Sequence, residues 1–418
     1  MDQAQRPVRL PLSRAQLSMY FAQQLDVANP SYTMAEYTDI EGPVDQDIFV
    51  AAAQAMYREV DAVHAHFVED EVGIGQVLGE PDNCAVSLVD LSAEPDPDAA
   101  AVAWMRRELG RPFDLSRPPL LTNILFRLGG DRFRWYKSCH HILMDAFAVP
   151  MLTRRAGEFY LTLAKGQELS ASPFGRLAET LAKESRYWAS ERCTADRAFW
   201  HSYLGDRHRT AGAVRRPGVP PCVFLRHTKL LTGAYERALC TSRHDWRCLA
   251  LIAGARIARQ WSTGDDVVIG LPVAARPGLV GQRTPAMLVN VLPLRMNVGP
   301  AVTGDLVAEV NQQMRRVAPH TRYRYEDIRR DLRLFAIDEH LFRVKVNVMG
   351  WEDSTAFAGW RAMPHVLSNG PVDDLSFTLY RTREGIRVNL DVNPELHHAE
   401  ESAGLIDEFV ASLTSLVG

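Results

Sequence analysis

The sequence predicts a mixed α/β (α+β) fold in two lobes, and three observations lead to this prediction. First, β-type runs alternate with amphipathic helical segments in both halves of the chain. Second, a chain of 418 residues has the length of two or three domains of about 150 residues each. Third, residues 205–221 are rich in Gly, Pro and Arg, as in a surface connection, and the alternation restarts after them. We expect an N-terminal lobe over residues 1–178 and a C-terminal lobe over residues 179–418.

The N-terminal lobe is expected to begin with an amphipathic helix. Ser13 and Gln16 have the spacing of a capping box. The apolar face of this helix would consist of Leu17, Tyr20, Phe21 and Leu25. Further along, the glycines at 129–130 separate two β-type runs and predict a hairpin. The other elements expected in this lobe are strands at 37–40 and 85–92, helices from about residue 45 and over 96–109, hairpin strands at 120–128 and 132–139, and a long helix over 147–165.

The rest of the chain is expected to repeat this mixed pattern without an obvious sequence repeat. Helical patterns continue from Gly166 through Leu204, and strands alternate with helices from Cys222 onward. A hairpin is predicted across Glu384 and Gly385 between strands at 375–381 and 386–392. The other expected elements are strands at 222–231, 267–271, 288–297 and 344–349, and helices over 245–261, 303–319 and 399–416.

Composition excludes several classes of protein. Apolar residues make up 46% and charged residues 23% of the chain, which excludes wholesale disorder. The 47 basic and 51 acidic residues give a formal net charge of −4, so no basic excess predicts nucleic-acid binding. No apolar run approaches the ~20 residues of a membrane span, and the first residues lack the apolar core of a signal peptide. Six scattered cysteines without a CxxC pair favour a reducing compartment. We therefore expect a cytoplasmic monomer that binds neither nucleic acid nor membranes.

The most informative stretch is HHILMDA at residues 140–146, between an expected strand and an expected helix. A loop at this position is where a rigid scaffold often presents reactive groups. A neutral imidazole can exchange a proton near pH 7, so His140 and His141 are candidate catalytic residues, although a structural role is the alternative. No third ligand lies at the spacing of a metal site, and adjacent strand residues point to opposite faces. We expect no metal.

HHILMDA resembles the HHxxxDG signature of nonribosomal peptide synthetase condensation domains, which are relatives of chloramphenicol acetyltransferase. Other segments resemble further motifs of that family in the same order. The opening segment LSRAQLSMY at 12–20 resembles SxAQxRLW, and PFDLSRPPL at 112–120 resembles PFDLSxxPLL. The remaining matches are GLPVAAR at 270–276, MLVNVLPLR at 287–295, HTRYRYED at 320–327 and GPVDDLS at 370–376. The resemblance extends over about residues 12–395, nearly the whole chain.

The resemblance implies two chloramphenicol acetyltransferase-like lobes in a V shape with a tunnel between them. It implies that His141 faces the tunnel as the catalytic residue and that the neighbouring His140 packs and orients. It also implies that Asp145 is structural and pairs with an arginine, for which Arg295 is the best match. Asn347 and Met144 are the residues expected to line the substrate tunnel, although a hydrogen bond at the strand end is an equal alternative for Asn347.

The implied reaction is amide formation between a donor acyl or peptidyl thioester and an acceptor amine. Both substrates would be tethered by phosphopantetheine arms to carrier protein domains, so the chain itself would need no cofactor. His141 would take the proton of the attacking amine or donate a hydrogen bond to the tetrahedral intermediate. A free-standing enzyme and the first domain of a larger chain both fit, and Asn29 to Tyr32 look most like initiating or aryl-accepting modules.

Two positions depart from the family pattern. Ala146 replaces the last glycine of HHxxxDG. Ala146 is expected to be harmless, because a helix start does not need the positive φ that favours glycine. The second family motif, RHExLRTxF, survives only between Glu59 and Phe67, with His64 at the arginine position. This loss leaves open a degenerate domain that docks carriers or recruits a partner.

Two other enzyme classes remain as alternatives. A coenzyme-A-dependent acyltransferase of the wider superfamily would act on a free amine or alcohol. An epimerisation domain would need a further tunnel glutamate, for which the sequence offers no segment. Two motifs are set aside: LGGD at 128–131 imitates a carrier-protein core but has Arg132 at the modified serine position, and His397-His398 is expected on a solvated helix start.

Overall fold

The computed structural model describes residues 8–80, 84–205, 224–276, 278–334, 340–349, 357–382 and 384–417. They form two compact units between which the chain passes more than once. Unit 1 contains residues 1–188, 276–289 and 354–370, and unit 2 contains residues 189–275, 290–353 and 371–418. This division differs from the contiguous one expected from the sequence, because two later segments return to unit 1. Their return depends on pairing between distant residues, for which a local pattern gives no signal.

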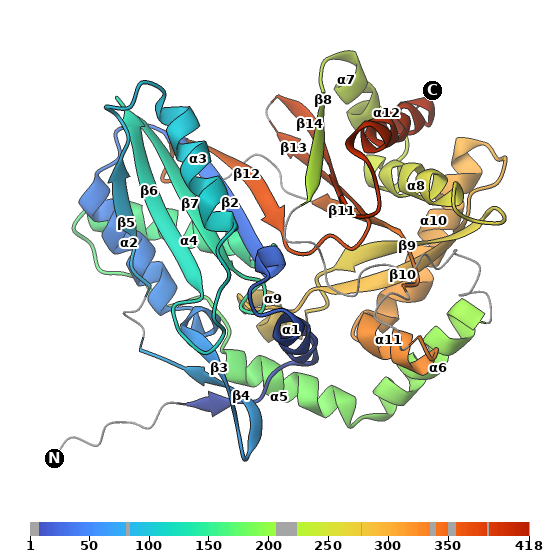
Figure 1. The fold of residues 1–418 in the computed structure, drawn as a ribbon, viewed down its shortest axis with the longest axis horizontal. Helices are drawn as coiled ribbons and strands as arrows, with labels where there is room; N and C mark the ends of the chain where they lie inside the picture. Colours follow the sequence, from blue (N-terminus) through green and yellow to red (C-terminus); the bar gives the residue numbers. More distant parts are fainter. Residues whose placement is uncertain are drawn as a thin grey trace. The chain divides into compact units, whose positions relative to one another are not determined.

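The main sheet of unit 1 has the strand order β12-β2-β7-β6-β5 (Figure 1). Its strands are β2 (Thr33–Glu41), β5 (Ser87–Asp90), β6 (Leu121–Gly129), β7 (Arg132–His140) and β12 (Arg361–Asn369). β2 pairs antiparallel with both β7 and β12, and β6 and β7 form the predicted hairpin. A smaller sheet has the order β1-β4-β3, with β1 (Arg9–Leu10), β3 (Ala65–Asp70) and β4 (Gly73–Leu78). The antiparallel partners of β2 therefore both end beside the start of β2.

Unit 1 contains the helices α1 (Arg14–Leu25), α2 (Gln46–Arg58), α3 (Pro97–Leu109), α4 (Ala148–Ala164), α5 (Leu177–Trp188) and α9 (Gly278–Arg283). Among them, α2 and α4 pack on one face of the main sheet and α3 packs on the other. Alternate residues of β7 belong to two different cores, as strand geometry requires. Trp135 packs with Phe49 of α2 and Leu152 of α4 in the larger core. Tyr136 packs with Met105 of α3 in the smaller one.

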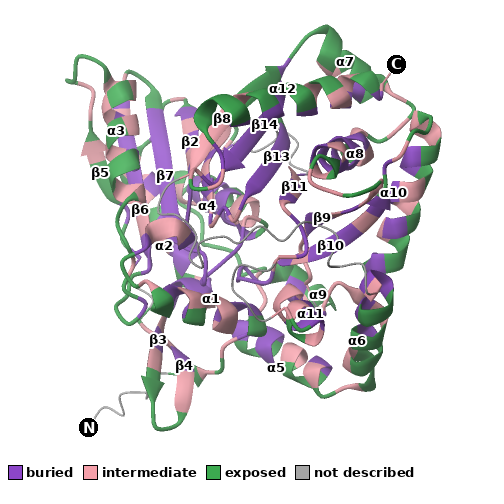
Figure 2. Cartoon of the chain, turned by 45° about the vertical axis from the view of Figure 1, so that its right-hand side comes forward, coloured by how far each residue is buried: buried purple, intermediate pink, exposed green. Residues whose placement is uncertain are grey.

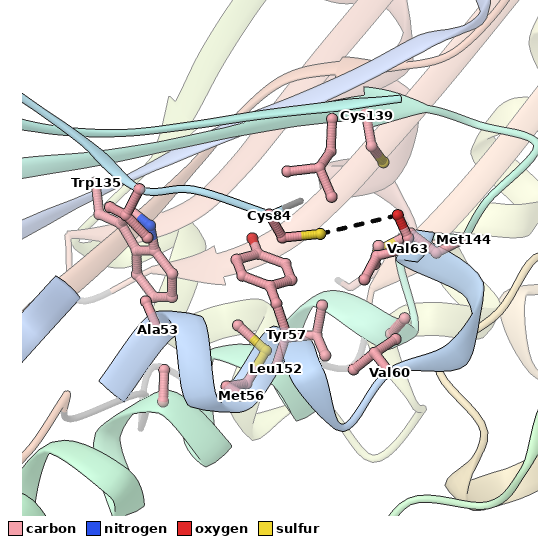
Figure 3. Close-up of a cluster of buried hydrophobic side chains, with 14 of the residues drawn as sticks. Ala53, Met56, Tyr57, Val60, Val63, Cys84, Trp135, Cys139, Met144 and Leu152 are labelled. Carbon is pink, nitrogen blue, oxygen red and sulfur yellow. Dashed lines mark hydrogen bonds between the residues drawn. The ribbon is translucent and has the colours of Figure 1, made fainter. Parts of the chain in front are cut away.

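The larger core of unit 1 contains two buried thiols (Figure 3). Cys84 lies beside Tyr57, and its Sγ is 3.9 Å from the carbonyl oxygen of Val63. Burial raises the pKa of Cys84 to about 12 and the pKa of Cys139 to about 12. Because the thiolate is the nucleophilic form of cysteine, these two residues serve as packing groups at neutral pH.

Unit 2 is built on one six-stranded sheet with the order β10-β9-β11-β13-β14-β8. Its strands are β8 (Leu225–Leu231), β9 (Asp266–Val273), β10 (Asn290–Asn297), β11 (Val344–Met349), β13 (Leu375–Thr382) and β14 (Gly385–Val392). Its helices are α6 (Glu191–Leu204), α7 (Ala234–Thr241), α8 (Trp246–Arg259), α10 (Thr303–Val317), α11 (Tyr325–Asp331) and α12 (Ala399–Ser415). Figure 2 shows buried strands and helices with exposed outer faces in this unit. Phe377 of β13 stacks on Phe409 of α12 with ring centroids 4.2 Å apart.

Most of the predicted elements are present, including the capping box between Ser13 and Gln16. The predicted apolar face of α1 is correct for Tyr20, which is buried, and wrong for Phe21 and Leu25, which are 54% and 63% exposed. Gln16 and Gln23 are buried instead, since their amides bond to backbone carbonyls inside unit 1. The β3–β4 hairpin, β12, α7, α9 and α11 were not predicted. Residues 222–223 of the predicted strand at 222–231 lie outside the described residues.

The structure also bears on membranes and metals. None of the helices in the described part of the chain combines the length and apolar character needed to span a bilayer. Across the described ranges, no group of three or more His, Cys, Asp or Glu side chains is arranged to hold a metal ion.

Candidate functional site

The HHILMDA segment joins β7 to α4 in unit 1. His140 is the last residue of β7 and pairs with Thr33, the first residue of β2. The next amide continues this contact, because the N–H of His141 donates to the carbonyl of Tyr32 at 2.8 Å. The backbone then turns, and the N–H of Leu143 donates to the carbonyl of His140 at 3.0 Å. Backbone hydrogen bonds alone therefore fix the main chain at both histidines.

The imidazole of His141 is buried, and a backbone carbonyl binds its Nδ1 edge. Its Nδ1 lies 3.0 Å from the carbonyl oxygen of Met144. A carbonyl oxygen only accepts hydrogen bonds, so Nδ1 carries the proton. In the neutral ring the lone pair is then on Nε2, the atom that can accept a proton from a substrate. Gly370 lies along the same side of the ring, since a Cβ built on it would be 2.5 Å from Cδ2 and 3.4 Å from Nε2.

The imidazole of His140 is held in the opposite tautomer. The backbone N–H of Ile142 donates to its Nδ1 at 3.1 Å, so Nε2–H donates to Oε1 of Gln23 at 3.0 Å. The Gln23 amide is oriented in turn, because its Nε2 donates to the carbonyls of Asp26 and Asn29. Burial, with the neighbouring His141 as a smaller cause, lowers the pKa of His140 to about 3. His140 is therefore a neutral, fully bonded neighbour of His141.

The low pKa of His140 predicts a dependence of stability on acid pH. The unfolded chain binds a proton at His140 near pH 6.5, whereas the folded chain does so only near pH 3. Stability from this group is therefore complete above pH 6.5 and is lost as the pH falls toward 3. Between pH 6 and pH 4.5 we expect the wild type to lose about 2 kcal/mol more unfolding free energy than His140→Gln. Urea denaturation at both pH values checks this, and equal losses would contradict the buried, neutral state of His140.

Asp145 is fully enclosed and all its charge is compensated within unit 1. Its Oδ1 lies 2.5 Å from Nη2 of Arg276, and both side chains are only 2% exposed. Its Oδ2 accepts hydrogen bonds from the backbone N–H groups of Leu288 and Val289 at 3.0 and 2.8 Å. Arg276 also donates to the carbonyl of Thr284 at 3.0 Å. The carboxylate thus ties the loop after β7 to the 276–289 segment that returns to unit 1.

The predicted pairing of Asp145 with Arg295 is wrong. Arg295 lies on β10 of unit 2, where its Nε and Nη2 bind the carboxylate of Asp266 at 2.8 and 2.5 Å. Its Nη1 also donates to the carbonyl of Tyr203. Both arginines belong to segments that resemble family motifs, so the motifs alone could not separate them. The signal available in the sequence was that Arg276 ends GLPVAAR, just before the segment that bonds to Asp145.

Met144 and Ala146 are the residues on either side of Asp145 in the loop after β7. The Met144 side chain is buried in the larger core of unit 1, and its assignment to a substrate passage stays a prediction. Its contribution to the site is the backbone carbonyl that binds His141. Ala146 lies in a turn just before α4 and is not among the residues with positive φ. The backbone at Ala146 therefore does not require glycine, and the expectation that alanine is harmless there stays a prediction.

Asn347 is a half-buried residue of β11 in unit 2 and pairs in register with Thr378 of β13. The preceding Val346 lies against Gly254 of α8, so the Asn347 side chain points to the opposite face of the sheet. Its assignment to a substrate passage stays a prediction.

The second family motif, between Glu59 and Phe67, keeps well-bonded or buried residues despite its substitutions. Glu59 binds the guanidinium of Arg155 through both oxygens at 2.7 and 2.9 Å. His64 is buried, with Nε2 2.9 Å from the carbonyl oxygen of Tyr57. Phe67 is buried in the larger core. Glu59, His64 and Phe67 of this motif therefore support the fold around α2 and α4.

The expectation that His397 is solvated is wrong. Its Nε2 lies 2.5 Å from Oδ1 of Asp374, and the two side chains are 2% and 0% exposed. Arg343 binds the other oxygen of Asp374 at 2.7 Å. Trp261 contacts both the His397 ring and the Arg343 guanidinium. Asp374 belongs to GPVDDLS, so this cluster holds the unit 2 end of that segment; a helix-start pattern gave no sign of it.

Known proteins resemble the chain over nearly its whole length. A family model described as the condensation domain matches residues 8–214 and 249–418. The dimodular nonribosomal peptide synthase of Bacillus subtilis (strain 168) is 34% identical over 94% of this chain and 17% of its own length. The isonitrile lipopeptide synthase of Streptomyces coeruleorubidus is 36% identical over 98% of this chain and 28% of its own length. The chain thus spans less than a third of the length of these two relatives.

Solved structures share the fold. A variant of the starter condensation domain of rhizomide synthetase, in complex with C8-CoA and Leu-SNAC, is 31% identical with a TM-score of 0.90. The match covers 98% of this chain and 94% of that one. The first condensation domain of the CDA synthetase is 28% identical with a TM-score of 0.88, over 98% of this chain and 96% of that one.

Proposed function

The chain belongs to the condensation domain family of nonribosomal peptide synthetases, and from this premise we propose that it joins a carrier-bound acyl or peptidyl thioester to the amine of a carrier-bound acceptor. The observation that carries the proposal at residue level is the tautomer of His141. Its Nδ1–H is bound by the Met144 carbonyl, so Nε2 is the basic atom of the neutral ring.

The reaction balances with His141 as the proton carrier. The acceptor nitrogen attacks the thioester carbonyl and forms the C–N bond, and the proton lost by nitrogen passes to Nε2. The tetrahedral intermediate then expels the thiolate, which takes this proton and leaves as a free thiol. General-base catalysis of this kind contributes about 10²–10⁴-fold, and the positioning of two bound reactants contributes about 7–11 kcal/mol.

A base role fits the bonding of His141 better than a hydrogen-bond donor role. The neutral ring has its proton on Nδ1, so Nε2 has no N–H to offer to an oxyanion. Asp145 does not act as the base, because its oxygens are taken up by Arg276 and two backbone amides. Asp145 is a positioning residue that fixes the loop carrying His141. His140 also fixes this loop, through its hydrogen bonds to the Ile142 amide and to Gln23.

The partners follow from the reaction. Two carrier protein domains would deliver the donor and the acceptor on phosphopantetheine arms, and the chain would need no cofactor of its own. The described cysteines are free thiols, which supports a reducing, cytoplasmic setting. The bonding of the second motif speaks against a degenerate docking domain, since Glu59 pairs with Arg155 and His64 bonds to the Tyr57 carbonyl.

A second candidate function is acyl transfer from coenzyme A to an amine. The similarity to a starter condensation domain in complex with C8-CoA and Leu-SNAC favours it. Intact-protein mass spectrometry separates the two functions: the chain is incubated with an aminoacyl-loaded acceptor carrier and either an acyl-loaded donor carrier or the same acyl group on coenzyme A. We expect amide on the acceptor carrier with the donor carrier. Product from coenzyme A alone would replace the proposed function by the second, and no product from either donor would contradict both.

A further inference from the structure

Gly370 makes an unusually close approach to His141. It follows the last residue of β12, is buried, and has a φ of +89°. A Cβ at this position would lie 2.5 Å from Cδ2, 3.4 Å from Nε2 and 3.6 Å from Cγ of His141. A carbon–carbon separation of 2.5 Å is far inside the optimal contact of about 3.5–4.0 Å. Only glycine therefore leaves the ring of His141 where the structure has it.

The ring of His141 is contacted on both of its flanks. Nδ1 and Cδ2 are the two atoms bonded to Cγ, so they define opposite edges of the imidazole. The Met144 carbonyl holds the Nδ1 edge by a hydrogen bond, and the Gly370 backbone lies against the Cδ2 edge. A ring fixed at both edges can turn neither about χ1 nor about χ2 without losing one of the two contacts. The direction of Nε2 is thereby determined.

Strand pairing explains why these two residues meet. β2 lies between β7 and β12, and it is antiparallel to both. Thr33 of β2 pairs with His140, and Met34 pairs with Asn369. The residues that follow these two strand ends, His141 and Gly370, therefore emerge on either side of the start of β2. The N–H of Gly370 donates to Oγ of Ser368 at 3.2 Å, which fixes the backbone at this point.

We propose that Gly370 is a positioning residue of the site, whose bare backbone sets the direction of Nε2 of His141. The proposal rests on the proposed function for its effect on catalysis, and on the contact alone for its effect on the ring. A Cβ at residue 370 pushes the ring from the Cδ2 edge against the Met144 carbonyl on the other edge, so the ring must turn and Nε2 is misplaced relative to the acceptor amine. Misplacement by about 1 Å can lower a rate on the order of 10²-fold.

The matched control is Gly359, which precedes β12 in the same segment. Its φ of +87° is close to that of Gly370, but a Cβ there meets nothing within 4 Å. Alanine at either position carries the same backbone strain, and only Gly370→Ala adds the contact with His141. We expect kcat for amide formation to fall about 10²-fold in Gly370→Ala with KM nearly unchanged, and Gly359→Ala to retain the wild-type kcat. Equal kcat values for the two variants would overturn the proposal.

A double-mutant cycle on thermal stability tests the contact without any assay of activity. In the wild type, Gly370→Ala is expected to lower Tm more than Gly359→Ala does. In the His141→Ala background, where the obstructing ring is gone, the two alanine substitutions are expected to lower Tm equally. If Gly370→Ala alone does not fold, the pair with His141→Ala should restore folding. An excess loss that persists in His141→Ala would overturn the proposal. If the proposed function is wrong, neither the wild type nor any variant will form amide, and the results of this stability cycle will be unchanged.

Discussion

Replacing His141 with alanine is expected to slow amide formation by about 10²–10⁴-fold and to leave the chain folded. The loss follows from removing the imidazole whose Nε2 would take the proton of the acceptor amine under the proposed function. The fold should persist because the backbone N–H of His141 still bonds to the Tyr32 carbonyl, and the Asp145–Arg276 pair is untouched. Single-turnover rates with loaded carriers, followed by intact-protein mass spectrometry, measure this effect.

The matched control for this variant is His201→Ala, since His201 lies exposed on α6 of unit 2. We expect the control to have the wild-type rate. A His141→Ala variant that turns over as fast as the control would remove general-base catalysis from the account and leave positioning as the source of the rate.

The second large effect concerns the Asp145–Arg276 pair. Arg276→Leu leaves the Asp145 carboxylate buried without its cation, and we expect a loss of about 3–5 kcal/mol in unfolding free energy. Arg295→Leu is the matched control, because Arg295 and Asp266 are 29% and 31% exposed. In this half-buried pair water can reach the charge left behind, so we expect this variant to lose clearly less unfolding free energy than Arg276→Leu. Urea denaturation of both variants measures the difference.

The same pair of variants decides between two partners for Asp145. The family resemblance led to the prediction of Arg295, whereas the structure pairs Asp145 with Arg276. A larger loss for Arg295→Leu than for Arg276→Leu would show that the motif-based pairing is the correct one.

The sequence was informative wherever the determining contacts are local. The capping box at Ser13 depends on residues three positions apart, and the β6–β7 hairpin depends on its glycine turn. The backbone at Ala146 is likewise local, and it lacks the positive φ that would favour glycine. The motif of histidines and aspartate was recognisable because its residues follow one another along a single loop.

Contacts between distant segments were not predictable in this way. Arg276 reaches Asp145 only because the 276–289 segment returns to unit 1. Gly370 reaches His141 because β12 adds to the edge of a sheet whose other strands lie more than two hundred residues earlier. His397 is buried because Asp374 and Arg343, from two other elements, surround it. A helical or strand period reports which side of an element is apolar, but it does not report which element will cover that side.

The burial of polar side chains was the second reason why sequence predictions differed from the structure. The apolar period on α1 pointed to Phe21 and Leu25, yet the buried side carries Gln16 and Gln23. Gln23 is buried because it supplies the acceptor for His140 and donates to two carbonyls. Burying an amide costs little free energy when all its hydrogen bonds are made. The hydrogen bonds of Gln23 therefore decide which side of the helix is buried.

The most direct test of the central claim is a long-range ¹H–¹⁵N spectrum of the histidine side chains at neutral pH, assigned with His141→Ala and His140→Gln. The account predicts a neutral His141 ring protonated on Nδ1 with an unprotonated Nε2, and a neutral His140 ring protonated on Nε2. A His141 ring that carries its proton on Nε2 would contradict the assignment of that nitrogen as the base.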